Sequence, residues 1–115
     1  MSDIQALQNE IEGAKAVVQR RDLALKLSEN REFRVLFTEE YFGSEIARLM
    51  VMSVDSNVDA ETRADCVKMA EAAARTKQYL SMVIQAGAHY ERTLPEMEAT
   101  LQEMLVERDA EEETR

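Results

Sequence analysis

The sequence predicts an all-α fold of three to four helices, forming a helical hairpin or bundle with a long, coiled-coil-like N-terminal helix and an acidic C-terminal tail. Glycine occurs three times and proline once in 115 residues, which leaves little turn chemistry. The composition is instead rich in Ala, Leu, Met, Glu, Gln, Arg and Lys, which have high helix propensity. Apolar residues also recur at alternating spacings of three and four over long stretches, which is the period of one helix face.

The length of the chain is typical of one domain with a modest core. We expect a single helical domain over residues 1–106, and its predicted helices are about 3–27, 31–54, 59–92 and 95–108. Residues 107–115 carry no apolar stripe that could be buried, so we expect them to be an acidic, frayed tail.

The first predicted helix has a narrow apolar seam. Ser2 and Gln5 form a possible capping box at its start. A second narrow seam lies near the C-terminal end of the chain, and such seams need a partner helix, either within a bundle or in another subunit. The residues that we expect at this interface are Ile4, Leu7, Ile11, Val18, Leu94, Met97, Leu101 and Met104.

The second predicted helix contains a cluster of aromatic residues within ten positions: Phe33, Phe37, Tyr41 and Phe42. Its N-cap is Ser28 or Asn30. Aromatic side chains bury the most area per residue, so this cluster is expected to be the centre of the core, or alternatively a partner-binding hot spot.

The third predicted helix begins after a polar loop and is capped by Asn57 or Asp59. Its apolar pattern keeps one phase from Cys66 to Met104, past Pro95. Proline inside a helix costs about 3 kcal/mol. Either one long helix bends near residues 87–95, or a short break restarts with Thr93 and Glu96 as a capping box; we favour the break.

No arrangement of residues predicts catalysis, a metal site or a cofactor. Cys66 is the only cysteine and His89 the only histidine. On one straight helix they would lie about 34 Å apart, too far for a nucleophile and its base. One cysteine and one histidine are too few for structural zinc. The loop from Asp55 resembles a calcium loop, but Ala60 and Cys66 stand where glycine and a bidentate glutamate are required. We therefore expect a protein that is not an enzyme.

Charge is distributed unevenly along the chain, whose net charge is −9. Residues 91–115 hold nine acidic and three basic groups, a net −6. The acidic patch expected there comprises Glu103, Glu107, Asp109, Glu111, Glu112 and Glu113. A basic patch is expected across the first helix boundary, at Lys15, Arg20, Arg21, Lys26, Arg31 and Arg34. Its small local excess in an acidic chain argues against nucleic acid as the partner, and pairing with the acidic segment, within or between chains, is the simpler interpretation.

The location expected is the cytoplasm. No stretch approaches the roughly 18 to 20 apolar residues of a membrane span, and the N-terminal sequence has no signal-peptide pattern. A single cysteine suits a reducing compartment.

The segment from Glu29 to Phe37, followed by that from Tyr41 to Leu49, resembles a stretch in small uncharacterised helical proteins of tailed bacteriophages. The resemblance covers about 20 residues, mostly aromatic positions and helix signals. Genes for such proteins often lie near head and packaging genes, so the resemblance implies a virion-assembly role in the host cytoplasm or the virion. It transfers no functional residue, because none is defined for that group.

Three functions are therefore open. The leading hypothesis is a structural or interaction protein that self-associates or joins a larger protein assembly through helix–helix contacts. The second is an acidic inhibitor that imitates nucleic acid and occupies a basic site on a host protein. The third is a helical nucleic-acid-binding subunit that uses the basic patch.

Overall fold

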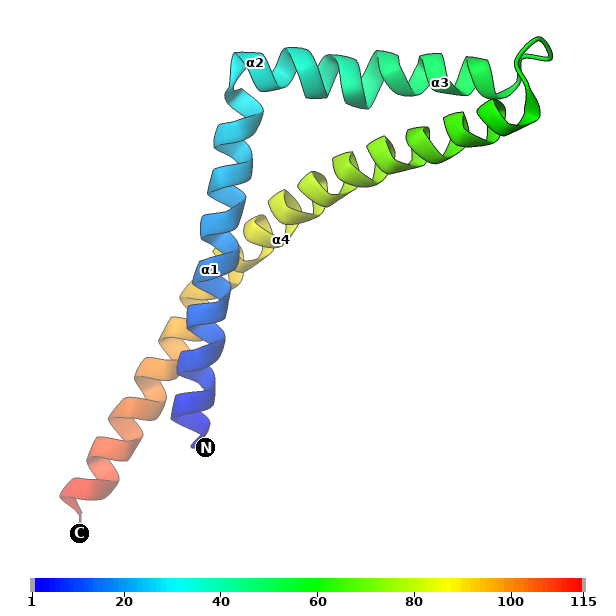
Figure 1. The fold of residues 1–115 in the computed structure, drawn as a ribbon. Coiled ribbons are helices and arrows are strands. Elements are labelled where there is room, and N and C mark those ends of the chain that lie inside the picture. Colours follow the sequence, from blue (N-terminus) through cyan, green and yellow to red (C-terminus); the bar gives the residue numbers. More distant parts are fainter. Residues whose placement is uncertain (1, 115) are drawn as a thin grey trace. The chain divides into compact units, whose positions relative to one another are not determined.

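The computed structural model describes residues 2–114. Met1 and Arg115, which bound the predicted domain and the predicted tail, lie outside the described residues. The helical elements are α1 (Asp3–Glu29), α2 (Arg31–Phe33), η1 (Arg34–Ser44), α3 (Glu45–Ser53) and α4 (Ala60–Glu113) (Figure 1). Elements α2, η1 and α3 follow one another without interruption, so three helical stretches account for nearly all of residues 2–114, and no strand occurs among them. The all-α prediction is confirmed.

Side-chain caps fix where the three stretches begin. In each case a polar side chain accepts a hydrogen bond from the backbone N–H three residues later: Ser2 Oγ from Gln5 (3.1 Å), Asn30 Oδ1 from Phe33 (2.9 Å) and Asp59 Oδ1 from Thr62 (2.8 Å). These bonds satisfy N–H groups that have no partner within the helix. Of the alternatives that the sequence left open, Asn30 and Asp59 are therefore the caps.

Element η1 is a π-helical segment, in which N–H groups bond five residues back, as the Glu45 N–H does with the Glu40 carbonyl. Such a segment has more residues per turn than the 3.6 of an α-helix. Phe33, Phe37, Phe42 and Ile46 are spaced by four, five and four residues. This spacing would drift around an α-helix but stays on one face of a wider one, so the π segment aligns the aromatic side chains.

Helix α4 continues through Pro95, so the predicted break before that residue is wrong, as are the predicted helices 59–92 and 95–108 as separate elements. The Thr93 hydroxyl donates to the Tyr90 carbonyl instead of capping a new helix. Pro95 is exposed, whereas Leu94 and Met97 on either side of it are half-buried. Burial of the apolar face on both sides of the proline therefore offsets the hydrogen bond that proline cannot make.

Helix α4 also extends to Glu113, so the frayed tail expected from residue 107 is wrong as secondary structure. Residues 107–114 are exposed, as their composition predicted. Their helix rests on local propensity, because Glu, Ala and Arg are good helix formers and the segment follows an established helix without a new nucleation step.

The chain forms two compact units. Unit 1 comprises residues 1–22 and 83–115, and unit 2 comprises residues 23–82. Helices α1 and α4 each contribute residues to both units. Whether the two units unfold together, as the predicted single domain would, is a separate question, so the prediction of one domain stays a prediction.

Unit 2 has its core between α3 and the first turns of α4, which run antiparallel to each other (Figure 1). Leu49 is only 2% exposed and clusters with Cys66 and Ala70, while Ile46 and Met52 pack against the cluster. The small residues of α4 let the larger side chains of α3 approach its backbone. Among the residues described in this unit, only two large apolar side chains are buried, Phe42 and Leu49.

Unit 1 consists of the first part of α1 running antiparallel to the last part of α4 (Figure 1). Both predicted seams lie in this unit. Ile11 and Ala14 are buried. The remaining predicted interface residues are half-buried: Ile4, Leu7, Val18, Leu94, Met97, Leu101 and Met104. Ile11 and Leu101 line one hollow, and Ala14 and Met97 another, so the two seams meet within one chain.

Candidate interaction surfaces

A buried arginine joins the two helices of unit 1. The Arg21 side chain is only 11% exposed, and its Nη1 donates to Glu91 Oε2 at 2.9 Å while its Nε donates to Asp22 Oδ1 at 2.8 Å. These hydrogen bonds raise the pKa of Arg21 above its ordinary value and lower the pKa of Glu91. A charge with so little solvent needs both carboxylates, so Arg21 acts here as a structural residue.

Gly87 makes room for this arginine. A Cβ atom built on Gly87 would lie 2.0 Å from the Arg21 Cβ, far closer than two carbon atoms can approach. Only glycine therefore permits this approach of α1 to α4. Sequence reasoning placed Gly87 near a possible bend and missed this contact. The available signal was a glycine in the apolar seam of one helix and a long polar residue continuing the seam of the other.

A second, weaker ion pair lies further along the same two helices. Lys15 Nζ is 4.0 Å from Glu98 Oε1, and both side chains are about half exposed. Exposed pairs at this distance contribute little to stability. Together with Arg21 and Glu91, however, this pair shows that two members of the predicted basic patch face acidic residues of the 91–115 segment in the same chain.

The predicted basic patch loses one of its six members to the interior of unit 1, and its residues are divided between the two units. Lys15, Arg20 and Arg21 belong to unit 1, whereas Lys26, Arg31 and Arg34 belong to unit 2. Arg20, Lys26, Arg31 and Arg34 are exposed, and Arg21 is buried. The number of cations that could face a phosphate backbone together is thus smaller than the sequence suggested.

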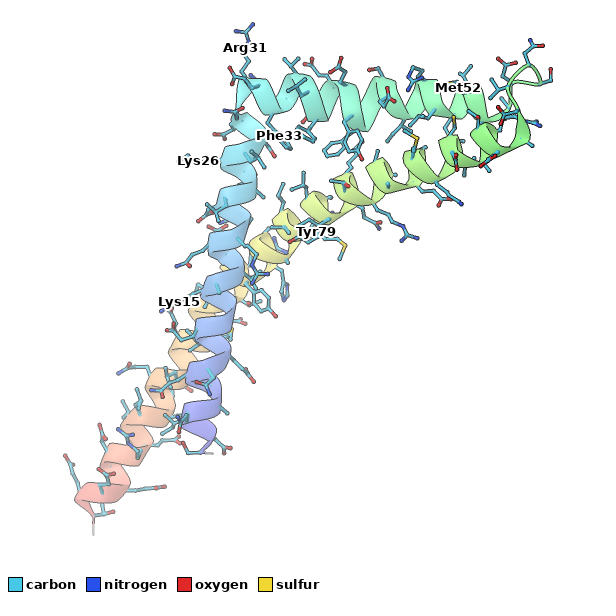
Figure 2. All side chains as sticks on the ribbon, viewed as in Figure 1. Lys15, Lys26, Arg31, Phe33, Met52 and Tyr79 are labelled. Carbon is cyan, nitrogen blue, oxygen red and sulfur yellow. The ribbon has the colours of Figure 1, made fainter. Side chains whose placement is uncertain are left out.

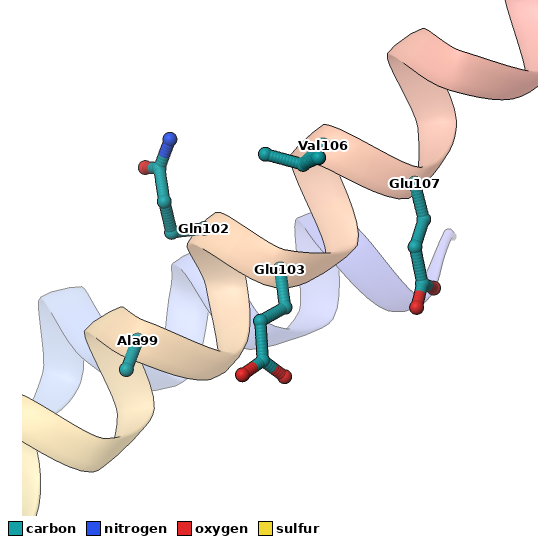
Figure 3. Close-up of a pocket in the computed structure, with 5 residues that line it drawn as sticks. All are labelled: Ala99, Gln102, Glu103, Val106 and Glu107. Carbon is teal, nitrogen blue, oxygen red and sulfur yellow. The ribbon is translucent and has the colours of Figure 1, made fainter.

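The predicted acidic patch lies on the last turns of α4, where all six of its residues are exposed. Figure 3 shows that Glu103 and Glu107 point to one side of the helix, while Gln102 and Val106 project from other parts of its surface. With Ala99 they line a shallow hollow formed by one helix alone. Such a surface has no walls that could enclose a small molecule.

The predicted aromatic cluster is a continuous stack along α2 and η1. Phe33 and Phe37 stack with ring centroids 5.0 Å apart, and Phe37 meets Tyr41 edge-on at 5.9 Å. Phe42 is buried, Phe33 and Tyr41 are half-buried, and Phe37 is 40% exposed. The cluster is therefore partly buried in unit 2 and partly exposed. Its role as a partner-binding hot spot stays a prediction.

Unit 2 exposes most of the large apolar side chains that the described chain leaves uncovered, and Figure 2 shows side chains projecting on all sides of its helices. Fourteen large apolar residues of the described chain are exposed, and all except Val106 lie in unit 2. The thirteen are Leu23, Leu25, Leu27, Val35, Leu36, Phe37, Met50, Val51, Val54, Val67, Met69, Tyr79 and Met82. Isolated exposed apolar residues are ordinary, but their concentration in one unit makes the helices of unit 2 the candidate interaction region.

Cys66 and His89, the two residues considered for chemistry, belong to different units. Cys66 is buried in the core of unit 2, and His89 is exposed in unit 1, where its ring contacts that of Tyr90. Within residues 2–114, no three His, Cys, Asp or Glu side chains are grouped so that they could hold a metal ion.

Among the described helices, none is both long and apolar enough to cross a membrane. The class that the fold and its surfaces define is an all-α protein with exposed apolar helix faces. Comparison with known proteins gave no match to a family model, a curated protein or a solved structure.

Proposed function

We propose that this chain is a non-enzymatic structural protein that self-associates, or joins a larger protein assembly, through contacts between helices. The observation that carries this proposal is the concentration of thirteen exposed large apolar side chains in unit 2. That unit buries only Phe42 and Leu49 among its large apolar residues. Covering the remaining apolar side chains with a second protein surface would add about 25 cal/mol per Å² of apolar area removed from water.

The finer architecture is part of the same proposal. We infer that the α1 and α4 segments of unit 1 form a coiled-coil-like hairpin, completed within the chain by the Arg21–Glu91 and Lys15–Glu98 pairs. Its seams are already half-buried or buried within the chain. The helices of unit 2 are then the part of the protein that is free to contact a partner.

Sedimentation velocity over about 1–100 µM tests self-association directly. We expect a concentration-dependent shift from monomer to dimer or a larger oligomer, because the apolar side chains of unit 2 are covered on association. Replacing exposed Val51 by Glu should weaken it, whereas replacing exposed Val106 by Glu in unit 1 should not. A chain that stays monomeric throughout, with Val51→Glu indistinguishable from the unchanged protein, would refute self-association.

We extend the proposal to an accessory role in virion assembly, acting in the host cytoplasm or the virion. The support for this step is the resemblance of residues 29–37 and 41–49 to helical proteins of tailed bacteriophages. The genes beside the one that encodes this chain test it. Neighbouring genes for capsid or DNA-packaging proteins would support the role, and a neighbourhood of metabolic genes would contradict it.

The alternative is an acidic inhibitor of a basic host protein, and the exposed carboxylates on the last turns of α4 favour it. This alternative predicts binding to a nuclease or polymerase that weakens with salt. The binding should be lost when Glu103, Glu107 and Asp109 are neutralised together. Unchanged binding by that triple variant would eliminate this alternative. The third hypothesis, nucleic-acid binding, fails if filter binding at low salt retains neither DNA nor RNA.

A further inference from the structure

The outward face of the second helical stretch carries one stripe of residues with a constant spacing. Residues four apart advance by slightly less than one turn in the π segment and by slightly more than one turn in α3, so the two offsets oppose and these residues stay on roughly the same face. The core face carries Phe42, Ile46 and Leu49. The stripe on the other side is exposed at every position: Arg31, Val35, Glu39, Gly43, Ala47 and Val51. Figure 2 shows its first residue, Arg31, projecting away from α4, and Phe33 on the opposite side.

This stripe is symmetrical about Gly43. Val35 and Val51 lie eight residues before and after it, and they are 45% and 68% exposed. Arg31 and Asp55 lie twelve residues before and after it, both exposed and of opposite charge. Asp55 lies just beyond the end of α3, where its N–H still bonds to the Met52 carbonyl at 3.2 Å, so it follows the stripe at the end of the helix. If a second copy lies antiparallel with Gly43 at the crossing point, each Val35 meets the partner's Val51 and each Arg31 meets the partner's Asp55.

The residues at the centre of the stripe have small side chains. Gly43 and Ala47 present almost no side chain, and Glu39 lies opposite the neighbourhood of Ala47 and Arg48 in such a pair. A Cβ atom on Gly43 would meet only the Thr38 carbonyl oxygen, at an ordinary 3.6 Å, so nothing in the described chain requires glycine there. Glycine in a helix costs up to about 1 kcal/mol relative to alanine. At the crossing of two helices the missing side chain allows the backbones to approach closely.

From this pattern, and resting on the self-association proposed above, we propose that two copies of the chain pair through residues 31–55 about a two-fold axis at Gly43. A two-fold interface uses the same patch on both subunits and must be complementary to itself. The stripe meets this requirement, because its valines pair with valines and its arginine with an aspartate. The paired charges set the antiparallel direction, since a parallel pair would place Arg31 beside Arg31.

Cysteine cross-linking tests the position of the axis. In Gly43→Cys the new thiols of two copies would lie at the axis, so mild oxidation should give a covalent dimer as the main product. Gly13→Cys is the matched control, because Gly13 is also an exposed helical glycine with open space around it, and it should remain largely uncross-linked. The unchanged chain serves as a second control, because Cys66 is buried. Equal cross-linking of both variants would overturn the inference.

Charge exchange tests the direction and the pairing. Arg31→Glu alone and Asp55→Arg alone should each weaken self-association by about tenfold, because each places two like-charged pairs at the interface. An equimolar mixture of the two variants should restore association as a mixed dimer, in which both pairs are again opposite in charge. No gain on mixing would overturn the inference.

The outcomes also separate this inference from the proposed function. A dimer in sedimentation whose Gly43→Cys variant does not cross-link overturns the two-fold pairing and leaves self-association standing. A monomer at all concentrations overturns both the two-fold pairing and self-association, and leaves only the assembly with a different protein.

Discussion

Arg21 and Gly87 show how a single pair of residues can fix the register of two helices. The guanidinium reaches Glu91 and Asp22, while its Cβ occupies the space that a side chain at position 87 would need. A shift of either helix by one turn would separate the arginine from Glu91 and place another side chain against it. Register therefore depends on this contact more than on the interchangeable apolar residues of the two seams.

Replacing Gly87 by Ala should destabilise the protein, although the same change in an ordinary helix stabilises it. The added Cβ must displace the Arg21 backbone or side chain at its rigid end, which we expect to cost about 1–3 kcal/mol. Gly13→Ala is the control, since nothing lies within 4 Å of its new Cβ, and it should stabilise by about 0.5–1 kcal/mol. Urea unfolding measures both, and equal effects of the two changes would contradict the packing described.

The Arg21–Glu91 pair predicts a dependence of stability on pH. The pKa of Glu91 is lowered from 4.5 in the folded protein by its hydrogen bond with Arg21. A depressed pKa contributes stability above the ordinary value, and this contribution is lost as pH falls through the folded value. Glu91→Gln should therefore lower the melting temperature at pH 7 and change it little near pH 2. Glu107→Gln, on the exposed end of α4, is the control and should have little effect at pH 7.

At the scale of the helical element, Pro95 sets a lost backbone hydrogen bond against burial of the apolar face of α4, and local sequence rules do not say which is larger. The ring removes the N–H that would bond to the Glu91 carbonyl, yet α4 passes through unbroken. Pro95→Ala should restore that bond without disturbing the buried face, because position 95 is exposed. We expect a gain of about 1–3 kcal/mol in unfolding free energy with unchanged helix content by circular dichroism. A loss of stability would indicate that proline terminates a helix there.

The success of sequence reasoning at this scale depended on how local the cause was. Asn30 and Asp59 were among the predicted caps, because capping needs only a polar side chain three residues before a free N–H. The break at Pro95 was wrong, because the burial that opposes it comes from α1, nearly eighty residues earlier in the chain. The π segment was missed as well. Its signal was present in the four- and five-residue spacings of Phe33, Phe37 and Phe42, which an ordinary α-helix does not keep on one face.

The candidate surfaces follow the same rule: features with a local cause were predictable, and those that depend on distant residues were not. The apolar seams of unit 1 follow from a three-and-four repeat, and the structure brings them together. One member of the basic patch was not predictable as buried, because the carboxylate that pairs with Arg21 lies seventy residues away in the sequence. Charge counted along a sequence therefore overestimates what a partner could meet at one time.

At the scale of the whole molecule, the continuity of α1 and α4 bears on how the chain unfolds. Each helix runs from one compact unit into the other without a break, at residues 22–23 and 82–83. Helices propagate cooperatively, so loss of the contacts in one unit removes the support for the helices of the other. We therefore expect the two units to unfold as one domain, despite their separate cores.

Leu49→Ala tests this expectation, since Leu49 is buried in unit 2 alone. The cavity should lower the unfolding free energy by about 2–4 kcal/mol. If the chain is one cooperative domain, hydrogen exchange of the slowest amides around Ile11 in unit 1 should accelerate by the same free energy as those around Leu49. Leu36→Ala, at an exposed position of the same helical stretch, should leave both sets unchanged. Acceleration confined to residues 23–82 would show that the two units are separate folding domains, joined by helices that can unwind between them.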